Sequence, residues 1–297
     1  METKLSFATA KYFLFNYMPR QGLSKCFRPP GRILMRILLS NDDGIDSRNL
    51  HLLTLALIKA GHEVCVIAPA EQHSGAGCGI TVHSPLLVKK VRFPLENGEF
   101  FNGTAVSGTP ADCVILGLLN LLPGFSPDLV ISGINFGPNA GQDVFFSGTV
   151  GAAAQAAMYG IPALAVSHCC IQGADLAHAE FAVRTFSAMD WETLPRHRVY
   201  NLNLPDCPAQ EIKGIKVCRH STSWPRLDAY ERRISPRGKE YFWMKNPFQH
   251  FQLDDEGTDK SWLHQNWATL SALRIDLNDE EAAQKIDENL LWSRAMA

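Results

Sequence analysis

Short apolar runs alternate with helix-like segments from residue 35 onward. The runs Ile37 to Leu39 and Glu63 to Ala68 have the length and composition of buried strands. Between them, Leu50 to Ala60 carries apolar residues at helical spacing and stops at Gly61. A strand, a helix and a second strand in this order predict a right-handed parallel crossover.

The same alternation continues along the chain. Asn97-Gly98, between two apolar stretches, predicts a β-hairpin. Thr109 followed by Pro110 predicts the start of a helix. Further expected elements are a strand over Asp128 to Ser132, a helix over Ala152 to Tyr159, a strand over Ile161 to Ser167, a helix over Ala177 to Met189 and a strand over Val199 to Leu204. The pattern therefore predicts an α/β fold, a doubly wound and mostly parallel sheet.

We divide the chain into three parts. Residues 1–34 carry Lys and Arg but a single acid, Glu2. We expect them to be an extension that adds nothing to the chemistry, ahead of a start at Met35; a basic targeting segment and a disordered arm are the alternatives. Residues 35–218 form the expected core domain.

The third part, residues 219–297, is expected to be an appendage. Arg, Pro and aromatic residues are frequent in its first half. Tyr241 to Trp243 and Thr269 to Leu277 are expected strands that pair outside the main sheet, and Asp279 to Ala297 an expected terminal helix. Such a segment would either cover the site or reach a neighbouring subunit.

Composition narrows the classes of partner. The chain has 297 residues and a formal net charge of −2, so it has no global field that would attract a nucleic-acid duplex or an anionic membrane. No apolar run reaches the roughly 18 residues that a membrane span needs. The eight cysteines include no C-x-x-C pair, which predicts reduced thiols and a cytoplasmic location.

Two adjacent acids, Asp42 and Asp43, follow the first predicted strand directly. Two carboxylates at the end of a buried strand are costly unless a positive charge lies between them. Hard divalent cations such as Mg²⁺ and Mn²⁺ prefer oxygen ligands of this kind. The alternative is structural: the pair forms a turn before Gly44 or caps the helix that follows. The dipeptide alone does not separate the two interpretations.

Neutral oxygens are expected near this acidic pair. The carboxyl ends of parallel strands meet at one edge of a sheet, and ligands bind there in such folds. Ser74 and Asn135 follow later predicted strands and would lie at this edge. Two carboxylates with neutral oxygens and water suit Mg²⁺ or Mn²⁺ better than zinc, which prefers His or Cys.

The segment Ser147-Gly148-Thr149 opens the predicted alanine-rich helix. Backbone N–H groups at a helix start, two hydroxyls and a glycine that permits close approach are typical of a phosphate-binding site. An ordinary N-cap is the alternative interpretation of Thr149. The Gly-rich residues 75–79 lack the spacing of dinucleotide-binding and NTPase loops, which argues against those classes.

Four of these segments together resemble the signatures of the SurE family, the stationary-phase survival nucleotidases. They are Ser40-Asn-Asp-Asp-Gly44, Ser107-Gly-Thr-Pro-Ala-Asp-Cys113, Ser132-Gly-Ile-Asn-x-Gly-x-Asn139 and Ser147-Gly-Thr-Val-Gly151. The similarity runs in order from Met35 to about Leu277. The chain departs from the pattern at Asn266 to Leu273, where members usually carry Gly-Tyr-x-Ser-x-Thr-Pro-Leu. Hydroxyls remain there at Thr269 and Ser271, whereas the Gly and the Pro are lost.

The resemblance implies a Rossmann-like core and one divalent cation, Mg²⁺ or Mn²⁺, per subunit. It implies hydrolysis of nucleoside 5′- and 3′-monophosphates, with short polyphosphate as a substrate of some members. The metal ligands that it implies are Asp42, Asp43, Ser74 and Asn135. The phosphate contacts that it implies are Asn139, Ser147, Gly148 and Thr149. It also implies a homodimer or homotetramer assembled through an exchanged C-terminal segment.

The resulting hypothesis is a metal-dependent phosphomonoesterase in which Asp42 or Asp43 takes the proton of the attacking water. Its expected partners are nucleoside monophosphates, with neither a nucleic-acid duplex nor a membrane. A nucleotide-binding module without catalysis is one alternative, and a transferase that acts on a phosphosugar is another.

Overall fold

The computed structural model describes residues 34–169, 173–223, 229–245, 256–286 and 288–296. Residues 1–33, almost the whole of the expected N-terminal extension, lie outside this part of the chain.

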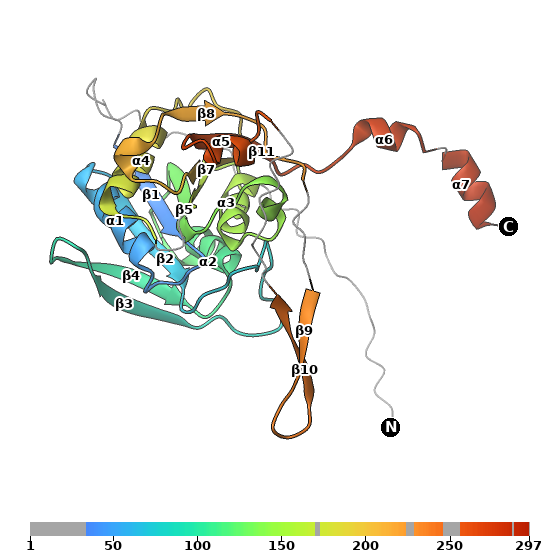
Figure 1. The fold of residues 1–297 in the computed structure, drawn as a ribbon, viewed down its shortest axis with the longest axis horizontal. Helices are drawn as coiled ribbons and strands as arrows, with labels where there is room; N and C mark the ends of the chain where they lie inside the picture. The colour runs from blue at the N-terminus through green and yellow to red at the C-terminus, as the bar shows by residue number, and fades with distance from the viewer. Residues whose placement is uncertain (1–33, 170–172, 224–228, 246–255, 287, 297) are drawn as a thin grey trace. The chain divides into compact units, whose positions relative to one another are not determined.

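A nine-stranded sheet forms the centre of the described residues, in the order β3-β4-β2-β1-β5-β6-β7-β11-β8 (Figure 1). Its strands are β1 (Arg36–Ser40), β2 (Glu63–Pro69), β3 (Val88–Pro94), β4 (Phe100–Val106), β5 (Leu129–Phe136), β6 (Ala163–His168), β7 (Arg198–Leu204), β8 (Ile215–Val217) and β11 (Ala268–Arg274). All neighbours from β4 to β7 pair in parallel. The predicted mostly parallel sheet is confirmed, and so is the hairpin at Asn97-Gly98, which joins antiparallel β3 and β4.

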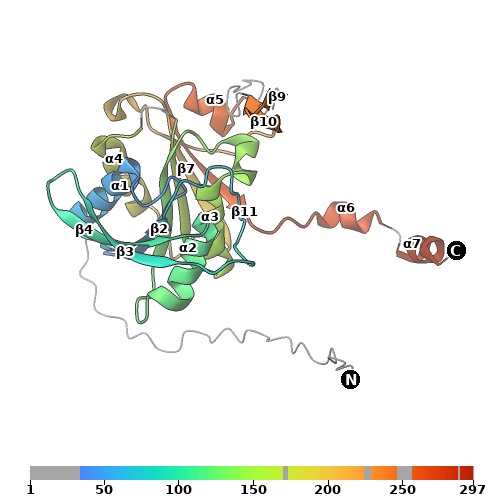
Figure 2. The ribbon, with the colours of Figure 1, turned by 90° about the horizontal axis from the view of Figure 1, so that it is seen from below.

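Helices cover both faces of this sheet (Figures 1 and 2). They are α1 (Arg48–Lys59), α2 (Pro110–Leu116), α3 (Gly148–Met158) and α4 (Leu176–Ser187), with short turns η1 (Gly117–Leu121), η2 (Gly141–Phe145) and η3 (Ala209–Glu211). Helices α1 and α4 pack on one face, and α2 and α3 pack on the other. None of the described helices combines the length and apolar character that crossing a bilayer requires.

The central strands carry apolar residues toward both faces over much of their length because both faces are covered. In β1, Ile37 and Leu39 belong to the apolar cluster under α1 and α4, whereas Leu38 belongs to the cluster under α2 and α3. All three side chains are fully buried. The short apolar runs read from the sequence are thus the middle layer of three.

The expected helix start at Thr109 is formed by a reciprocal pair of hydrogen bonds. The Thr109 hydroxyl accepts the backbone N–H of Asp112 at 3.1 Å, and the Asp112 carboxylate accepts the N–H of Thr109 at 2.9 Å. Two of the N–H groups that a helix start leaves unpaired are satisfied in this way.

One strand of the C-terminal part lies in the main sheet. The expectation that Thr269 to Leu277 pairs outside it is wrong, because β11 pairs antiparallel with β7, with Thr269 opposite Asn203. Strand β7 is buried along nearly all of its length, so its second edge needs backbone partners that water cannot supply. The other expected strand, over Tyr241 to Trp243, does pair separately: β9 (Ala229–Ile234) and β10 (Glu240–Lys245) form a two-stranded antiparallel sheet.

The C-terminal residues form two short helices. The expected single helix over Asp279 to Ala297 is wrong: α6 spans Glu280–Gln284 and α7 spans Glu288–Ala295, after a separate short helix α5 at Asp259–Leu263. The Asp279 carboxylate caps α6 by accepting the N–H of Ala282 at 2.9 Å. Helix α6 buries no residue, so no packing favours a longer helix over one short turn.

The cysteines that the structure describes are free thiols, at positions 65, 78, 113, 169, 207 and 218. Cys26 and Cys170 lie outside the described residues.

Candidate active site

The candidate site lies where β1 and β5 end side by side. These neighbours pair through Ser40 and Ser132, and the chain leaves them toward opposite halves of the sheet. In an α/β sheet this reversal creates a crevice at the carboxyl ends of the two strands. Asp43 follows β1, and its Oδ2 accepts the backbone N–H of Phe136, the last residue of β5, at 3.2 Å.

Asp42 and Asp43 are held in a tight bend after β1. The amide of Asn41 donates to the carbonyl of Gly44 at 3.0 Å, and Gly44 has a φ of +96°, which favours glycine. The residue at the N-cap of α1 is Ser47, so the interpretation of the acidic pair as a cap of that helix is wrong. The turn is present, and it brings two neighbouring carboxyl groups to the end of the strand.

The two carboxyl groups lie in an environment that disfavours their charge. Burial raises the pKa of Asp42, which is 3% exposed. Burial, and then the charge of Asp42, raise the pKa of Asp43 to about 7. The hydrogen bond from the Phe136 N–H lowers this pKa but does not offset the rise. Two adjacent carboxylates that resist ionisation are a site that a cation would stabilise.

Asn135 presents an oxygen at the same place. Its Nδ2 donates to the carbonyls of Phe136 at 3.1 Å and Gly137 at 2.9 Å, so both amide hydrogens face the backbone. The Oδ1 atom is thereby left as the acceptor of this side chain. The strand register shifts between Ser132 and Asn135, after which Asn135 pairs with Ser167 of β6.

Ser74 lies in the loop after β2, and a backbone contact joins this loop to the acidic bend. The N–H of His73 donates to the carbonyl of Asp42 at 2.7 Å. The hydroxyl of Ser74 is exposed and accepts from Gln72 at 2.9 Å, rather than contacting either aspartate. The structure therefore brings the Ser74 loop to the site, whereas the Ser74 side chain is engaged elsewhere.

The start of α3 lies directly against Asp42. Ser147 is the N-cap, because its hydroxyl accepts the N–H of Val150 at 3.0 Å, so the interpretation of Thr149 as the N-cap is wrong. The Thr149 hydroxyl donates instead to Oδ1 of Asp42. A Cβ on Gly148 would lie 2.8 Å from Cβ of Asp42, so only glycine permits this approach.

The first turn of α3 keeps a donor for an anion. The N–H group of Gly148 occupies the first helical position, where no intrahelical acceptor exists, whereas the N–H group of Thr149 is directed at the Asp42 carboxylate. The positive end of the helix dipole adds to the attraction of the Gly148 N–H for negative charge. A phosphate group and a divalent cation would thus be neighbours at this edge.

Asn139, the remaining expected phosphate contact, is 6% exposed and tied to two strands. Its N–H donates to Oδ1 of Asn203 at 2.8 Å, and its carbonyl accepts from Nδ2 of Asn201 at 2.7 Å. Its own Nδ2 donates to the hydroxyl of Ser167 at 2.8 Å. No role was predicted for Asn201, Asn203 or Ser167 from the sequence. The alternation Asn-x-Asn on one strand face was the available signal.

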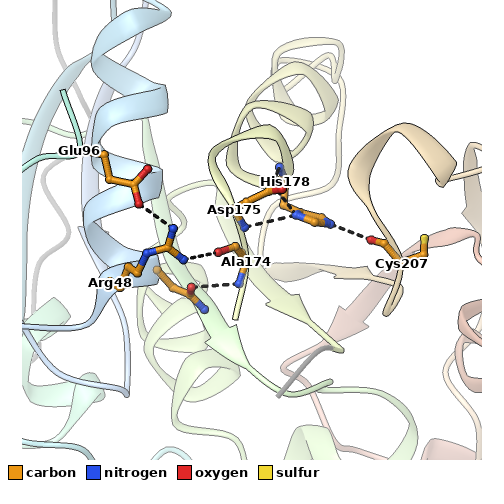
Figure 3. A network of polar contacts seen from close by, with 7 residues as sticks. Arg48, Glu96, Ala174, Asp175, His178 and Cys207 are labelled. Carbon is orange, nitrogen blue, oxygen red and sulfur yellow. Dashed lines mark hydrogen bonds and ion pairs between the residues drawn. The ribbon is translucent and has the colours of Figure 1, made fainter. Parts of the chain in front are cut away.

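The segments that follow β6 and β7 are joined to α1 and to the β3–β4 turn by a second polar network (Figure 3). Arg48, at the start of α1, donates to the carbonyl of Ala174 at 2.8 Å and pairs with Glu96 at 2.6 Å. The ring of His178 contacts Asp175 at 2.7 Å and the carbonyl of Cys207 at 2.9 Å. These contacts hold the neighbouring loops in place beside the candidate site.

His168 ends β6, and we expect it to make the stability of the protein depend on pH. Burial, and then the neighbouring His178 ring, lower its pKa to about 4, and the two ring centroids are 4.2 Å apart. The unfolded chain, with a His pKa of about 6.5, therefore binds more protons between these values. The free energy of unfolding should be unaffected above about pH 6.5 and should fall by about 2–3 kcal/mol toward pH 4.

Urea unfolding between pH 7.5 and 4.5 measures this effect. His168→Leu should lose this part of the pH dependence, and His83→Gln, at an exposed position, should keep it. Equal pH dependence of wild type and His168→Leu would contradict the assignment to His168.

Comparison with known proteins gives a family match. The family described as Survival protein SurE matches residues 37–225. A 5′-nucleotidase SurE from Nitratidesulfovibrio vulgaris (strain DSM 19637 / Miyazaki F) is 44% identical over 250 residues, which cover 84% of this chain and 90% of that protein. A 5′-nucleotidase SurE from Synechococcus elongatus is 36% identical over 85% of this chain and 98% of that protein.

A solved structure shows the same fold. The crystal structure of the SurE protein from Aquifex aeolicus superposes with a TM-score of 0.68 at 33% sequence identity, and the match covers 84% of this chain and 98% of that one. The family match spans β1 to β8 and so includes every residue of the candidate site. The order of strands, the crevice at β1 and β5 and these matches agree: the chain belongs to the SurE family.

Proposed function

We propose that this protein is a divalent-metal-dependent phosphomonoesterase that hydrolyses nucleoside 5′- and 3′-monophosphates. One observation carries the proposal: two adjacent acids, the buried Asp42 and the half-buried Asp43, follow β1, and Asp42 lies against the N-terminus of α3 with Thr149 bonded to it. An acidic pair attracts a cation and a helix start attracts an anion, so together they suit a metal ion and a phosphate group. The relatives named 5′-nucleotidase support nucleotides as the phosphate esters.

The residues present fit a hard cation. Burial disfavours the charge of the acidic pair. The pKa of Asp43 is raised by burial and by Asp42, and no described cationic side chain lowers it. Within the described ranges, no group of three or more His, Cys, Asp and Glu side chains could hold a metal ion. We propose a donor set of two carboxylates with the neutral oxygens of Asn135 and, once its hydroxyl turns from Gln72, Ser74; this set suits Mg²⁺ or Mn²⁺ rather than zinc.

Each group of the site has a separate role in the proposed hydrolysis. A bound cation would polarise a phosphoryl oxygen and lower the pKa of a water molecule. Asp42 is held by Thr149, so we assign to Asp43 the acceptance of the proton from the attacking water. The N–H group of Gly148 at the start of α3 would stabilise the charge that builds on the phosphoryl oxygens. The second Nδ2 hydrogen of Asn139 would donate to the same group.

Assembly and further substrates extend the proposal. We propose that the protein is cytoplasmic. We also propose a homodimer or homotetramer, because β10 exposes Phe242 and Trp243, with 55% and 62% of their surface accessible. Exposed aromatic side chains of this kind are typical of surfaces that bind another chain. Short polyphosphate is a second proposed substrate, since it carries the same terminal phosphoryl group.

Metal removal tests the proposed function directly. Protein treated with EDTA should release no phosphate from AMP or 3′-AMP, and Mn²⁺ or Mg²⁺ should restore the release. The same ions should raise the melting temperature in a saturable way, because they bind only the folded site. Full turnover in EDTA, or binding of AMP without phosphate release across both metals, would contradict the proposal.

A further inference from the structure

The segment that carries Asn139 leaves β5 without the support of a strand ladder. Strand β5 pairs with β6 as far as Phe136, and the chain then continues through residues 137–140 to η2. Asn139 and Ala140 are nevertheless buried, at 6% and 0% exposed. Buried backbone groups need partners, and here secondary structure does not provide them.

Side chains of β6 and β7 provide these partners. The N–H of Asn139 donates to Oδ1 of Asn203 at 2.8 Å, and the carbonyl of Asn139 accepts from Nδ2 of Asn201 at 2.7 Å and, more weakly, from Nδ2 of Asn203 at 3.2 Å. The Asn139 side chain adds a bond of 2.8 Å to Ser167. Both polar groups of the Asn139 backbone and its side chain are thus fixed by three neighbours.

Two of these neighbours, Ser167 and Asn203, belong to one row across the sheet. Asn135 of β5 lies opposite Ser167 of β6, and Ser167 lies opposite Asn203 of β7. Ser167 is fully buried and Asn203 is 1% exposed. The row begins at an expected metal ligand and ends at the residue that holds Asn139, so the position of Asn139 relative to the acidic pair is set by rigid strands.

We propose that Asn203 and Ser167 are positioning residues, which hold Asn139 where its amide reaches the phosphoryl group of the substrate. This inference rests on the proposed function, because it assigns to the same site the residues that place its phosphate donor. Neither residue touches the substrate in this proposal. Their effect passes through Asn139, and a shift of about 1 Å in such a donor is enough to cost roughly 100-fold in rate.

Asn203→Leu and Ser167→Ala test the proposal, with Thr269→Val as the matched control. Leu has the same branched shape as Asn but forms no hydrogen bond, and Ala removes only the Ser167 hydroxyl. Thr269 is fully buried on β11 directly opposite Asn203, and its hydroxyl has no hydrogen-bond partner within the described part of the chain. The control therefore changes a buried polar group in the same layer without touching Asn139.

The measurements are kcat and KM for AMP with Mn²⁺, and the Kd of inorganic phosphate by calorimetry, both below each variant's unfolding transition. Asn203→Leu should raise KM and the phosphate Kd roughly 5- to 10-fold, and kcat/KM should fall roughly 100-fold. Ser167→Ala should raise both constants about 3-fold or more, and Thr269→Val should leave them unchanged.

Comparison of kcat with KM and the phosphate Kd distinguishes a positioning role from an effect on folding. A merely structural role would reduce the amount of active protein, so it would lower kcat and leave KM and the phosphate Kd as they are. That result, or wild-type constants in both Asn203→Leu and Ser167→Ala, would overturn the inference. If wild type binds phosphate but releases none from AMP, the proposed function fails, and the phosphate Kd of the variants still tests the positioning. If Asn203→Leu does not fold, Ser167→Ala decides.

Discussion

Asp43→Asn is expected to abolish most phosphate release while the protein still folds. The variant removes the half-buried carboxylate of Asp43, the group that we assign to accept the proton of the attacking water. Loss of a general base alone typically costs about 10²- to 10⁴-fold in rate, and the weaker hold on a divalent cation adds to that loss. Phosphate release from AMP in Mn²⁺, with circular dichroism as the check on folding, measures the result.

The same variant should be more stable than wild type when no metal is bound. The pKa of Asp43 is about 7 in the folded protein, above its ordinary value of 3.8, so the folded state binds more protons between these values. Stability therefore falls as pH rises from about 4 to 7, and the full penalty is present above pH 7. Removing the charge should raise the free energy of unfolding in EDTA at pH 8 on the order of 2 kcal/mol.

Asp46→Asn is the matched control for Asp43→Asn. Asp46 lies in the same turn but is exposed, so replacing its carboxylate with an amide should leave both turnover and stability near wild type. An active Asp43→Asn protein would contradict the assignment of the site. A less stable but inactive one would leave the site in place and refute the account of its electrostatics.

The sequence predicted the elements whose signal is local. Ile37 to Leu39 could be recognised as a buried strand because both faces of β1 are covered, so the run is apolar without interruption. Thr109 and Pro110 marked a helix start whose hydrogen bonds are between residues three apart. The pairing of β11 with β7 was not predictable in this way, because a single strand does not encode which edge it will join.

The candidate site shows the same division. Asp42 and Asp43 stand out because two adjacent acids after an apolar run are chemically unusual. The roles of Ser147 and Thr149 could not be separated from the sequence, because both are ordinary helix-start residues. Their difference depends on the Thr149 hydroxyl meeting a carboxylate 107 residues earlier in the chain. Tertiary contacts of this length decide function and leave little local signal.

Gly151→Ala is expected to destabilise the protein although alanine favours helices. Gly151 lies in the first turns of α3, and a Cβ there would be 2.0 Å from the carbonyl oxygen of Gly77 and 2.6 Å from its carbon. The gain in helix propensity is about 1 kcal/mol. A collision with backbone cannot be relieved by rotating a side chain, so the loop must move and lose the bond of 3.0 Å from the Gly77 N–H to Phe146.

The collision should outweigh the propensity, with a net loss of about 1–3 kcal/mol in the free energy of unfolding. Because the displaced loop carries Ser74, turnover should fall as well. Gly75→Ala is the control in the same loop: its φ is +79° and no atom lies within 4 Å of a Cβ, so it tests backbone strain without a collision. Urea unfolding should show a loss of about 1 kcal/mol for Gly75→Ala. A Gly151→Ala protein as stable as wild type would show that the loop is not held against α3, and that Ser74 reaches the site by another arrangement.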